Sequence, residues 1–220
     1  MPKRDPERYS EDYLRHHADG VVTRMKTWLE RRALAHALEL AGYPDSVLDI
    51  PCGTGRFWPT LVRWCTGSIV AMDVNPAMVR VALREAPEAV RCRVTASESS
   101  LFSIQAPDKS VEAVVSLRFF HHLAHRSDRL RALAELQRVA RETLIVSIMT
   151  DGNLSAWMKR RRSRENLHEK REGYARRVRL PRRTFEWEAR SVALDVIGYV
   201  DVLPWISKWR FYVLGLPRPS

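Results

Sequence analysis

Two acids and two glycines are the residues of this sequence whose types and spacing point most directly to chemistry. The stretch "VLDIPCGTGRF", residues 47–57, is an apolar run that ends in Asp49 and continues into Gly53 and Gly55. Glycine has no side chain, so a ligand can approach the backbone closely at these positions. Asp73 ends the next apolar run, 20 residues after Gly53. This distance suits a carboxylate that accepts hydrogen bonds from both hydroxyls of a ribose.

Three nucleotide ligands compete for such a loop. A phosphate-binding NTPase loop needs Gly-Lys-Ser/Thr, whereas Gly55 is followed by Arg56. A dinucleotide-binding loop needs a third glycine, whereas position 58 is Trp58, and Asp49 would lie beside a pyrophosphate of like charge. S-adenosylmethionine (SAM) carries a sulfonium, an ammonium and only one carboxylate. An acid at the loop therefore suits SAM better than a pyrophosphate.

The remaining apolar patterns describe the elements that must hold these residues. Short apolar runs predict strands at residues 46–50, 68–74, 90–96, 110–120 and 143–149. Helical patterns follow at residues 28–41, 56–65, 75–87, 127–142 and 183–194. Asn75 and Pro76 are typical of a helix start and begin the helix predicted at 75–87. Ser127 or Asp128 is expected to cap the separate helix predicted at 127–142. The last two apolar runs, at 196–205 and 209–216, predict an antiparallel hairpin.

Alternating strands and helices predict an α/β fold. We expect a Rossmann-like doubly wound sheet, mostly parallel with an antiparallel C-terminal strand, and with helices on both faces. No internal repeat or second core is visible, so residues 1–220 are expected to form a single domain. Within it we expect an N-terminal helical segment at 1–42 and a basic cap or insert at 151–190.

Three stretches carry a family resemblance. "VLDIPCGTG", "VAMDVNPAMV" and "SVEAVVSLRFFHHL" resemble, in order and spacing, the signatures of class I SAM-dependent methyltransferases. The closest group is the small-molecule one that includes the ubiquinone- and menaquinone-type enzymes. The resemblance covers roughly residues 30–150 and, more weakly, the final hairpin. The chain departs from the family at Pro51, where glycine is common, and at Ser97, where aspartate is common.

The resemblance implies a cofactor site built from the ends of the first four strands. It assigns Asp49, Gly53 and Gly55 to the methionine end of SAM, Asp73 to the ribose, Val74, Ser97 and Glu98 to the adenine, the Leu117 carbonyl to the amino group, and Phe119 and His122 to the neighbourhood of the transferred methyl.

The stretch "FFHHLAH" holds His121, His122 and His125. No acid or cysteine joins them at metal-ligand spacing, so we expect no metal site. A neutral imidazole can take a proton from a hydroxyl near pH 7, which makes His121 and His122 candidate general bases. A core or pocket-lining role is the other interpretation of His122.

Positive charge is concentrated in one segment. Residues 159–190 hold 13 Lys or Arg and five Glu, whereas the whole chain has a net charge of +11. One interpretation is a solvated basic face. In the other, Arg161 and Arg164 bind a carboxylate or phosphate in forked geometry, with Trp157 among the aromatic residues that face an amphipathic substrate or a membrane surface.

Together these features predict a SAM-dependent methyltransferase that yields S-adenosylhomocysteine and acts on a small or lipid-linked, anionic acceptor, at oxygen. RNA methylation is an alternative that the basic charge favours, although no appended RNA-binding module is visible. A non-catalytic SAM-fold scaffold is a second alternative, and the intact "PCGTG" with Asp73 weighs against it. The charged N-terminus and the odd number of cysteines, three without CxxC spacing, predict a cytoplasmic protein, with contact to the cytoplasmic membrane face left open.

Overall fold

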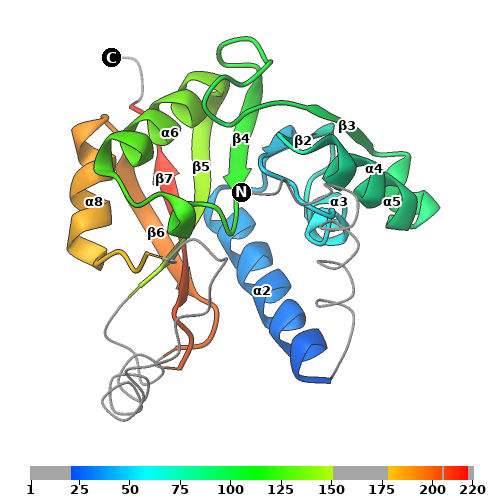
Figure 1. Cartoon of the computed structure of the whole chain (residues 1–220), viewed down its shortest axis with the longest axis horizontal. Coiled ribbons are helices and arrows are strands. Elements are labelled where there is room, and N and C mark those ends of the chain that lie inside the picture. Colours follow the sequence, from blue (N-terminus) through cyan, green and yellow to red (C-terminus); the bar gives the residue numbers. More distant parts are fainter. Residues whose placement is uncertain (1–20, 151–177, 205, 218–220) are drawn as a thin grey trace, which may run out of the picture.

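The computed structural model describes residues 21–150, 178–204 and 206–217, and places a single mixed sheet at the centre of the molecule (Figure 1). The sheet has seven strands in the order β3-β2-β1-β4-β5-β7-β6. The strands are β1 Val47–Asp49, β2 Ile69–Asp73, β3 Val94–Glu98, β4 Val111–Ser116, β5 Ala140–Met149, β6 Asp195–Asp201 and β7 Trp209–Gly215.

The pairing of the strands confirms the predicted fold class. β1 pairs in parallel with β2 and β4, and the parallel set extends through β3 and β5. β7 runs antiparallel to both of its neighbours, β5 and β6. The mostly parallel sheet with an antiparallel C-terminal hairpin is therefore the one that the strand patterns predict.

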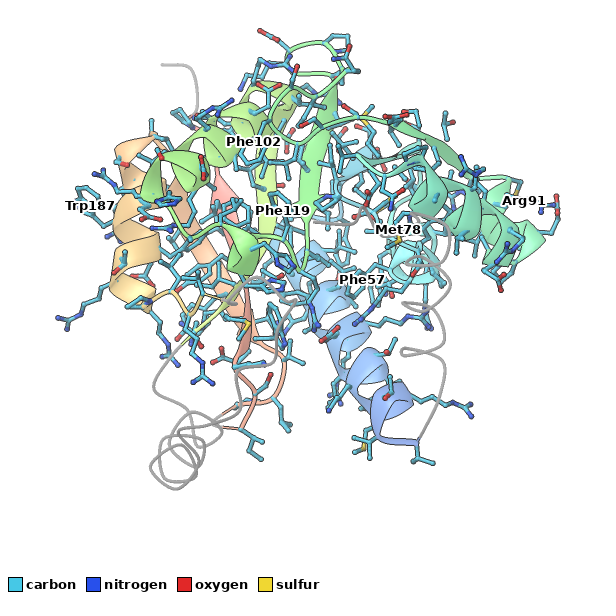
Figure 2. All side chains as sticks on the ribbon, in the orientation of Figure 1. Phe57, Met78, Arg91, Phe102, Phe119 and Trp187 are labelled. Atoms are coloured by element: carbon cyan, nitrogen blue, oxygen red, sulfur yellow. The ribbon has the colours of Figure 1, made fainter. Side chains whose placement is uncertain are left out.

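Helices cover both faces of this sheet (Figures 1 and 2). They are α2 Val21–Leu40, α3 Trp58–Trp64, α4 Pro76–Glu85, α5 Glu88–Arg91, the 3-10 helix η1 Phe120–His122, α6 Arg126–Val139 and α8 Arg182–Ser191.

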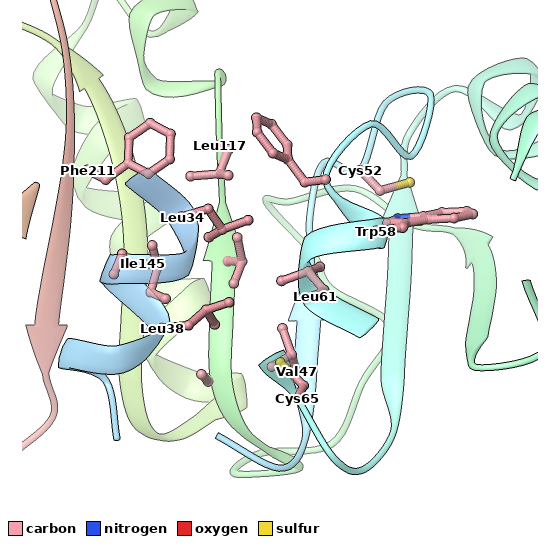
Figure 3. Packing of buried hydrophobic residues seen from close by; sticks show 14 of the residues in the cluster. Leu34, Leu38, Val47, Cys52, Trp58, Leu61, Cys65, Leu117, Ile145 and Phe211 are labelled. Carbon is pink, nitrogen blue, oxygen red and sulfur yellow. The ribbon is translucent and has the colours of Figure 1, made fainter. Parts of the chain in front are cut away.

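Two apolar cores lie on opposite faces of the sheet. One includes Leu34 of α2, Leu61 of α3 and Phe211 of β7 (Figure 3). The other includes residues of α6 and α8 and Tyr212 of β7. Phe211 and Tyr212 are adjacent, and they enter different cores because successive strand side chains point to opposite faces.

The helix and strand boundaries predicted from the sequence agree with the structure at the start of α4 and differ from it at α6 and β3. The Asn75 side chain accepts a hydrogen bond from the Ala77 N–H at 3.0 Å, which confirms the predicted start of α4. The cap predicted at Ser127 or Asp128 is wrong, because α6 follows His125 and has no side-chain cap. The strand predicted at 90–96 instead begins at Val94, since Glu88–Arg91 form the short helix α5. Ser97 and Glu98 therefore end β3 and do not follow it.

Candidate cofactor and methyl-transfer site

The loop after β1 leaves the sheet where the strand order reverses, because β1 lies between β2 and β4. In open α/β sheets, this switch point at the carboxyl ends of the strands is where ligands bind. The backbone fixes the loop to both neighbouring strands. The Ile50 N–H donates to the Val115 carbonyl at 2.9 Å, and the Cys52 N–H donates to the Met72 carbonyl at 2.8 Å.

The two loop glycines serve different purposes. Both have positive φ, +55° at Gly53 and +70° at Gly55, a region that side chains rarely adopt. A Cβ added at Gly53 would meet no atom within 4 Å, whereas one at Gly55 would lie 2.8 Å from the Trp58 ring. Gly53 therefore borders open space that a ligand can enter, while Gly55 makes room for the fully buried Trp58.

Asp73, at the end of β2, holds the glycine loop. Its carboxylate accepts hydrogen bonds from the Gly53 N–H and from the Asn75 N–H, each at 2.9 Å. Burial raises the pKa of Asp73, and these two N–H donors oppose the rise. Each carboxylate oxygen retains a second acceptor site, so the same group can both position the loop and accept bonds from a ligand.

Asp49, at the end of β1, is more deeply buried. Burial raises the pKa of its carboxyl to about 8, and the nearby Asp73 charge adds to the rise. The Trp58 indole lowers the pKa of Asp49 and so opposes this rise. The distance and angle between Trp58 Nε1 and Asp49 are nevertheless not those of a regular hydrogen bond. Within the described part of the chain, Asp49 Oδ2 accepts no hydrogen bond. Because the charged form of this carboxyl has no donor to stabilise it, a cation placed beside Asp49 would favour its ionisation.

The end of β4 forms the other wall of this edge. Leu117 is buried, and Arg118 follows it with φ +62° and donates its N–H to Ser147 Oγ at 2.7 Å. Phe119 packs edge-on against Phe102, which follows β3, with 6.1 Å between ring centroids (Figure 2).

The two candidate general bases occupy different environments. The His121 side chain is buried and packs edge-on against Trp209 with 5.0 Å between ring centroids. His122 is exposed, and its ring centroid lies 3.9 Å from that of His121. The exposed imidazole is therefore the one that an acceptor can reach from solvent.

Comparison with known proteins accounts for this arrangement. Residues 47–143 match the sequence profile of a family described as a methyltransferase domain. Malonyl-[acyl-carrier protein] O-methyltransferase of Paenibacillus sp. is 29% identical over 120 residues, which cover 53% of this chain and 41% of that protein. A methyltransferase-like protein of Schizosaccharomyces pombe is 32% identical over 93 residues, 42% of this chain and 33% of its own length. The chain thus spans less than half the length of these relatives.

The solved structures agree on the fold. Magnesium protoporphyrin IX methyltransferase of Synechocystis, determined with bound S-adenosylhomocysteine, superposes with a TM-score of 0.73 at 14% identity and covers 94% of each chain. By sequence profile over residues 47–143 and by overall fold, the chain resembles SAM-dependent methyltransferases. These matches support the predicted family and SAM as its cofactor, while the group within the family is not distinguished.

The methyltransferase site fits SAM on two observations of its own. The unpaired Asp49 Oδ2 suits a cationic group, and the open space at Gly53 suits a ligand that passes close to the backbone. Val74 follows Asp73 with 63% of its surface exposed, an apolar side chain suited to an adenine face. Ser97 and Glu98 are exposed beside it, because Glu98 is in register with Asp73. These assignments to parts of the cofactor stay predictions.

A set of ion pairs that was not predicted from the sequence joins α2 to the glycine loop after β1. The buried Glu30 forms ion pairs with Arg56 of the loop and, at 2.6 Å, with Arg118 after β4. The Arg31 guanidinium donates two hydrogen bonds to the Arg56 carbonyl, at 2.9 and 2.8 Å. The sequence does contain a sign of these ion pairs. Glu30 precedes Ala33, Leu34 and Ala37 by three, four and seven residues, so it lies on the buried face of the helix. An acid in that stripe needs a buried partner.

Several sequence-based predictions fall on residues outside the described ranges. They are Trp157, Arg161 and Arg164, residues 151–177 of the basic segment predicted at 151–190, and residues 1–20 of the helical segment predicted at 1–42. Among the residues that the structure describes, no group of three or more His, Cys, Asp or Glu is arranged to hold a metal ion. Cys52 and Cys65 are buried free thiols, and Cys92 is an exposed one. No helix in the described ranges is both long and apolar enough to cross a bilayer.

Proposed function

We propose that the chain transfers the methyl group of SAM to an oxygen of a small or lipid-linked, anionic acceptor. The observation that carries the proposal is the pair of buried acids at the switch point. Asp49 has an unpaired oxygen, and Asp73 accepts a hydrogen bond from Gly53, which borders open space. The name of the Paenibacillus relative supports oxygen as the acceptor atom, because that protein is named a malonyl-[acyl-carrier protein] O-methyltransferase.

The bound cofactor would supply a sulfonium methyl whose displacement releases a neutral thioether. Because this leaving group is good, the work of the protein is to hold and align the reactants. Asp73 would accept the ribose hydroxyls while it fixes Gly53, and Val74, Ser97 and Glu98 would border the adenine. Asp49, once ionised, would place a negative charge beside the cationic end, where Leu117 offers its carbonyl.

The acceptor side would be formed by Phe119 and the two histidines. His122 is exposed, and its imidazole can take the proton from an acceptor hydroxyl in line with the methyl. His121 would support it through the ring contact and through packing on Trp209. An acceptor that is already a carboxylate needs no base, so loss of His122 separates the two acceptor classes.

Isothermal titration with SAM tests the cofactor, and a radiolabelled-methyl assay over carboxylate, hydroxyl and RNA acceptors tests the acceptor. A scaffold without activity would bind SAM and label none of them. The net charge of +11 favours RNA as a second candidate. Retention of RNA that weakens steeply with salt, together with label in RNA, would replace the small-molecule proposal.

Anionic recognition has a test of its own. Reversing Arg161→Glu and Arg164→Glu should raise KM for an anionic acceptor and leave the SAM titration unchanged. The effect should weaken with added salt, since exposed charges are screened over ~8–10 Å. An unaltered KM at low salt would remove these arginines from the acceptor site.

A further inference from the structure

The first two turns of α2 carry an apolar face that points away from the protein. Val21, Met25 and Trp28 recur at the spacing of one helix face, and 82%, 55% and 56% of their surfaces are exposed. The residues buried in the core, among them Ala33, Leu34 and Ala37, lie on the opposite side of the helix. We call Val21, Val22, Met25 and Trp28 the outer face of α2.

This concentration is unusual for the molecule. Four of the large apolar residues that the structure shows exposed fall within eight consecutive positions, whereas the others are spread over six elements and loops. Single exposed apolar residues are normal on a protein surface. A contiguous group marks a surface that binds something.

The charge around the outer face identifies what it fits. Arg24, Lys26 and Arg32 are exposed on the same helix, and Arg32 lies over the Trp28 ring at 5.7 Å from its centroid. Residues 21–29 contain no acid, and Glu30 is buried in its ion pairs with Arg56 and Arg118. Apolar side chains that include a tryptophan, with exposed bases on the same helix, are the chemistry of a helix that lies in the interface of an anionic membrane.

The position of the outer face agrees with this partner. Glu30 contacts the carboxyl-end edge of the sheet, where the cofactor loop and the end of β4 lie. The residues before Glu30 extend beyond that edge (Figure 1). A surface that binds the outer face would therefore lie next to the mouth of the methyltransferase site.

We propose that the outer face of α2 docks the protein on an anionic membrane surface. The inference is independent of which acceptor is methylated, and it goes beyond the proposed reaction. It would bring a lipid-linked acceptor to the site by placing the site edge against the bilayer.

Vesicle flotation of the full chain tests the proposal, with phosphatidylcholine vesicles alone and with phosphatidylglycerol added. The wild type should float with the anionic vesicles, and Met25→Glu/Trp28→Glu should lower partitioning by roughly tenfold or more, because two apolar side chains are lost from the interface. Trp187→Glu/Ile197→Glu is the matched control. Those residues are 54% and 52% exposed, and Trp187 also lies under an arginine, with Arg126 4.2 Å from its ring centroid.

A second measurement reports insertion directly. An environment-sensitive fluorophore on Met25→Cys, in a Cys92→Ser background, should shift to the blue with anionic vesicles, whereas the same label at Ile197→Cys should not. Cys52 and Cys65 are buried and will not compete for the label.

Three results would overturn the proposal. The first is equal flotation of the wild type and the outer-face variant, and the second is loss of flotation in the control variant alone. The third is a wild type that does not float but sediments as an oligomer that Met25→Glu/Trp28→Glu dissociates, since the outer face would then bind a second copy of the chain.

Discussion

Buried acids are handled in opposite ways in two regions of the molecule. Between α6 and α8, Arg129 and Glu188 form a bidentate pair at 2.8 and 2.6 Å, and Arg129 also donates to the carbonyls of Leu123 and Ala124. At the switch point, Asp49 is as deeply buried and keeps an unpaired oxygen. The Arg129–Glu188 pair holds α6 against α8. The carboxyl of Asp49 has no such partner, so a cationic ligand that binds beside it would stabilise its charged form. From this difference we predict a structural role for the Arg129–Glu188 pair and a ligand-binding role for Asp49.

The largest effect is expected at the satisfied pair. Arg129→Met leaves Glu188 buried without a partner and should lower the free energy of unfolding by about 3–5 kcal/mol. Denaturant titration measures this loss. Arg129→Met/Glu188→Met should recover most of it, because an apolar pair leaves no unpaired charge. If Arg129→Met is as stable as the wild type, the Arg129–Glu188 pair does not stabilise the packing of α6 on α8.

The next effect concerns Asp73, which both positions the loop and is expected to bind the ribose. Asp73→Asn keeps the shape and removes the charge, so affinity for SAM should fall ten- to a hundredfold, or roughly 1.5–3 kcal/mol. Isothermal titration measures it, with Asp195→Asn, an exposed acid at the start of β6, as the control. Native affinity in Asp73→Asn would remove Asp73 from the cofactor site.

Alanine substitutions at Gly53 and Gly55 are expected to have different effects on stability and on SAM affinity. Each Gly→Ala substitution forces a side chain into positive φ at a cost of about 1–2 kcal/mol. Gly55→Ala adds a clash with Trp58 and should lower stability the more of the two. Gly53→Ala should weaken SAM binding out of proportion to its loss of stability. Equal losses of stability and of affinity in both variants would contradict the different purposes inferred for them.

The last prediction is a pH dependence set by Asp49. Its carboxyl has an ordinary pKa of 3.8, and burial in the folded chain raises the pKa to about 8. Over that range the folded state holds a proton that the unfolded state lacks, so this group makes stability fall as pH rises. A cationic ligand favours the ionised carboxylate, so SAM affinity should rise from about pH 6 to about pH 8, by at most about tenfold per unit.

Titration of SAM at several pH values measures this slope, and Asp49→Asn should flatten it. A slope that persists in Asp49→Asn would assign the pH dependence to another group. A wild-type affinity that does not change with pH would show that Asp49 is already ionised before SAM binds.

The sequence was sufficient for features that depend on neighbouring residues. The mostly parallel sheet with its antiparallel C-terminal hairpin, the start of α4 at Asn75 and the carboxylates at two strand ends follow from periodicity and short motifs. It was insufficient where a contact depends on how the folded chain packs. The pattern does not show that the Trp58 ring lies where a Cβ on Gly55 would be, although the two residues are only three positions apart. Nothing near Glu30 identifies Arg56 and Arg118, 26 and 88 residues away, as its partners. Such contacts are set by packing of the whole fold and not by local preference.

The place of β7 has a consequence for synthesis. Residues 209–215 lie between β5 and β6, and every one of them is buried. While the chain emerges from the ribosome, the apolar edge of β5 stays open until these residues appear, and β6 has no strand to pair with. The incomplete sheet presents an edge that other chains can join. Expression conditions that slow the last stage of translation are therefore expected to favour aggregation over yield of folded protein.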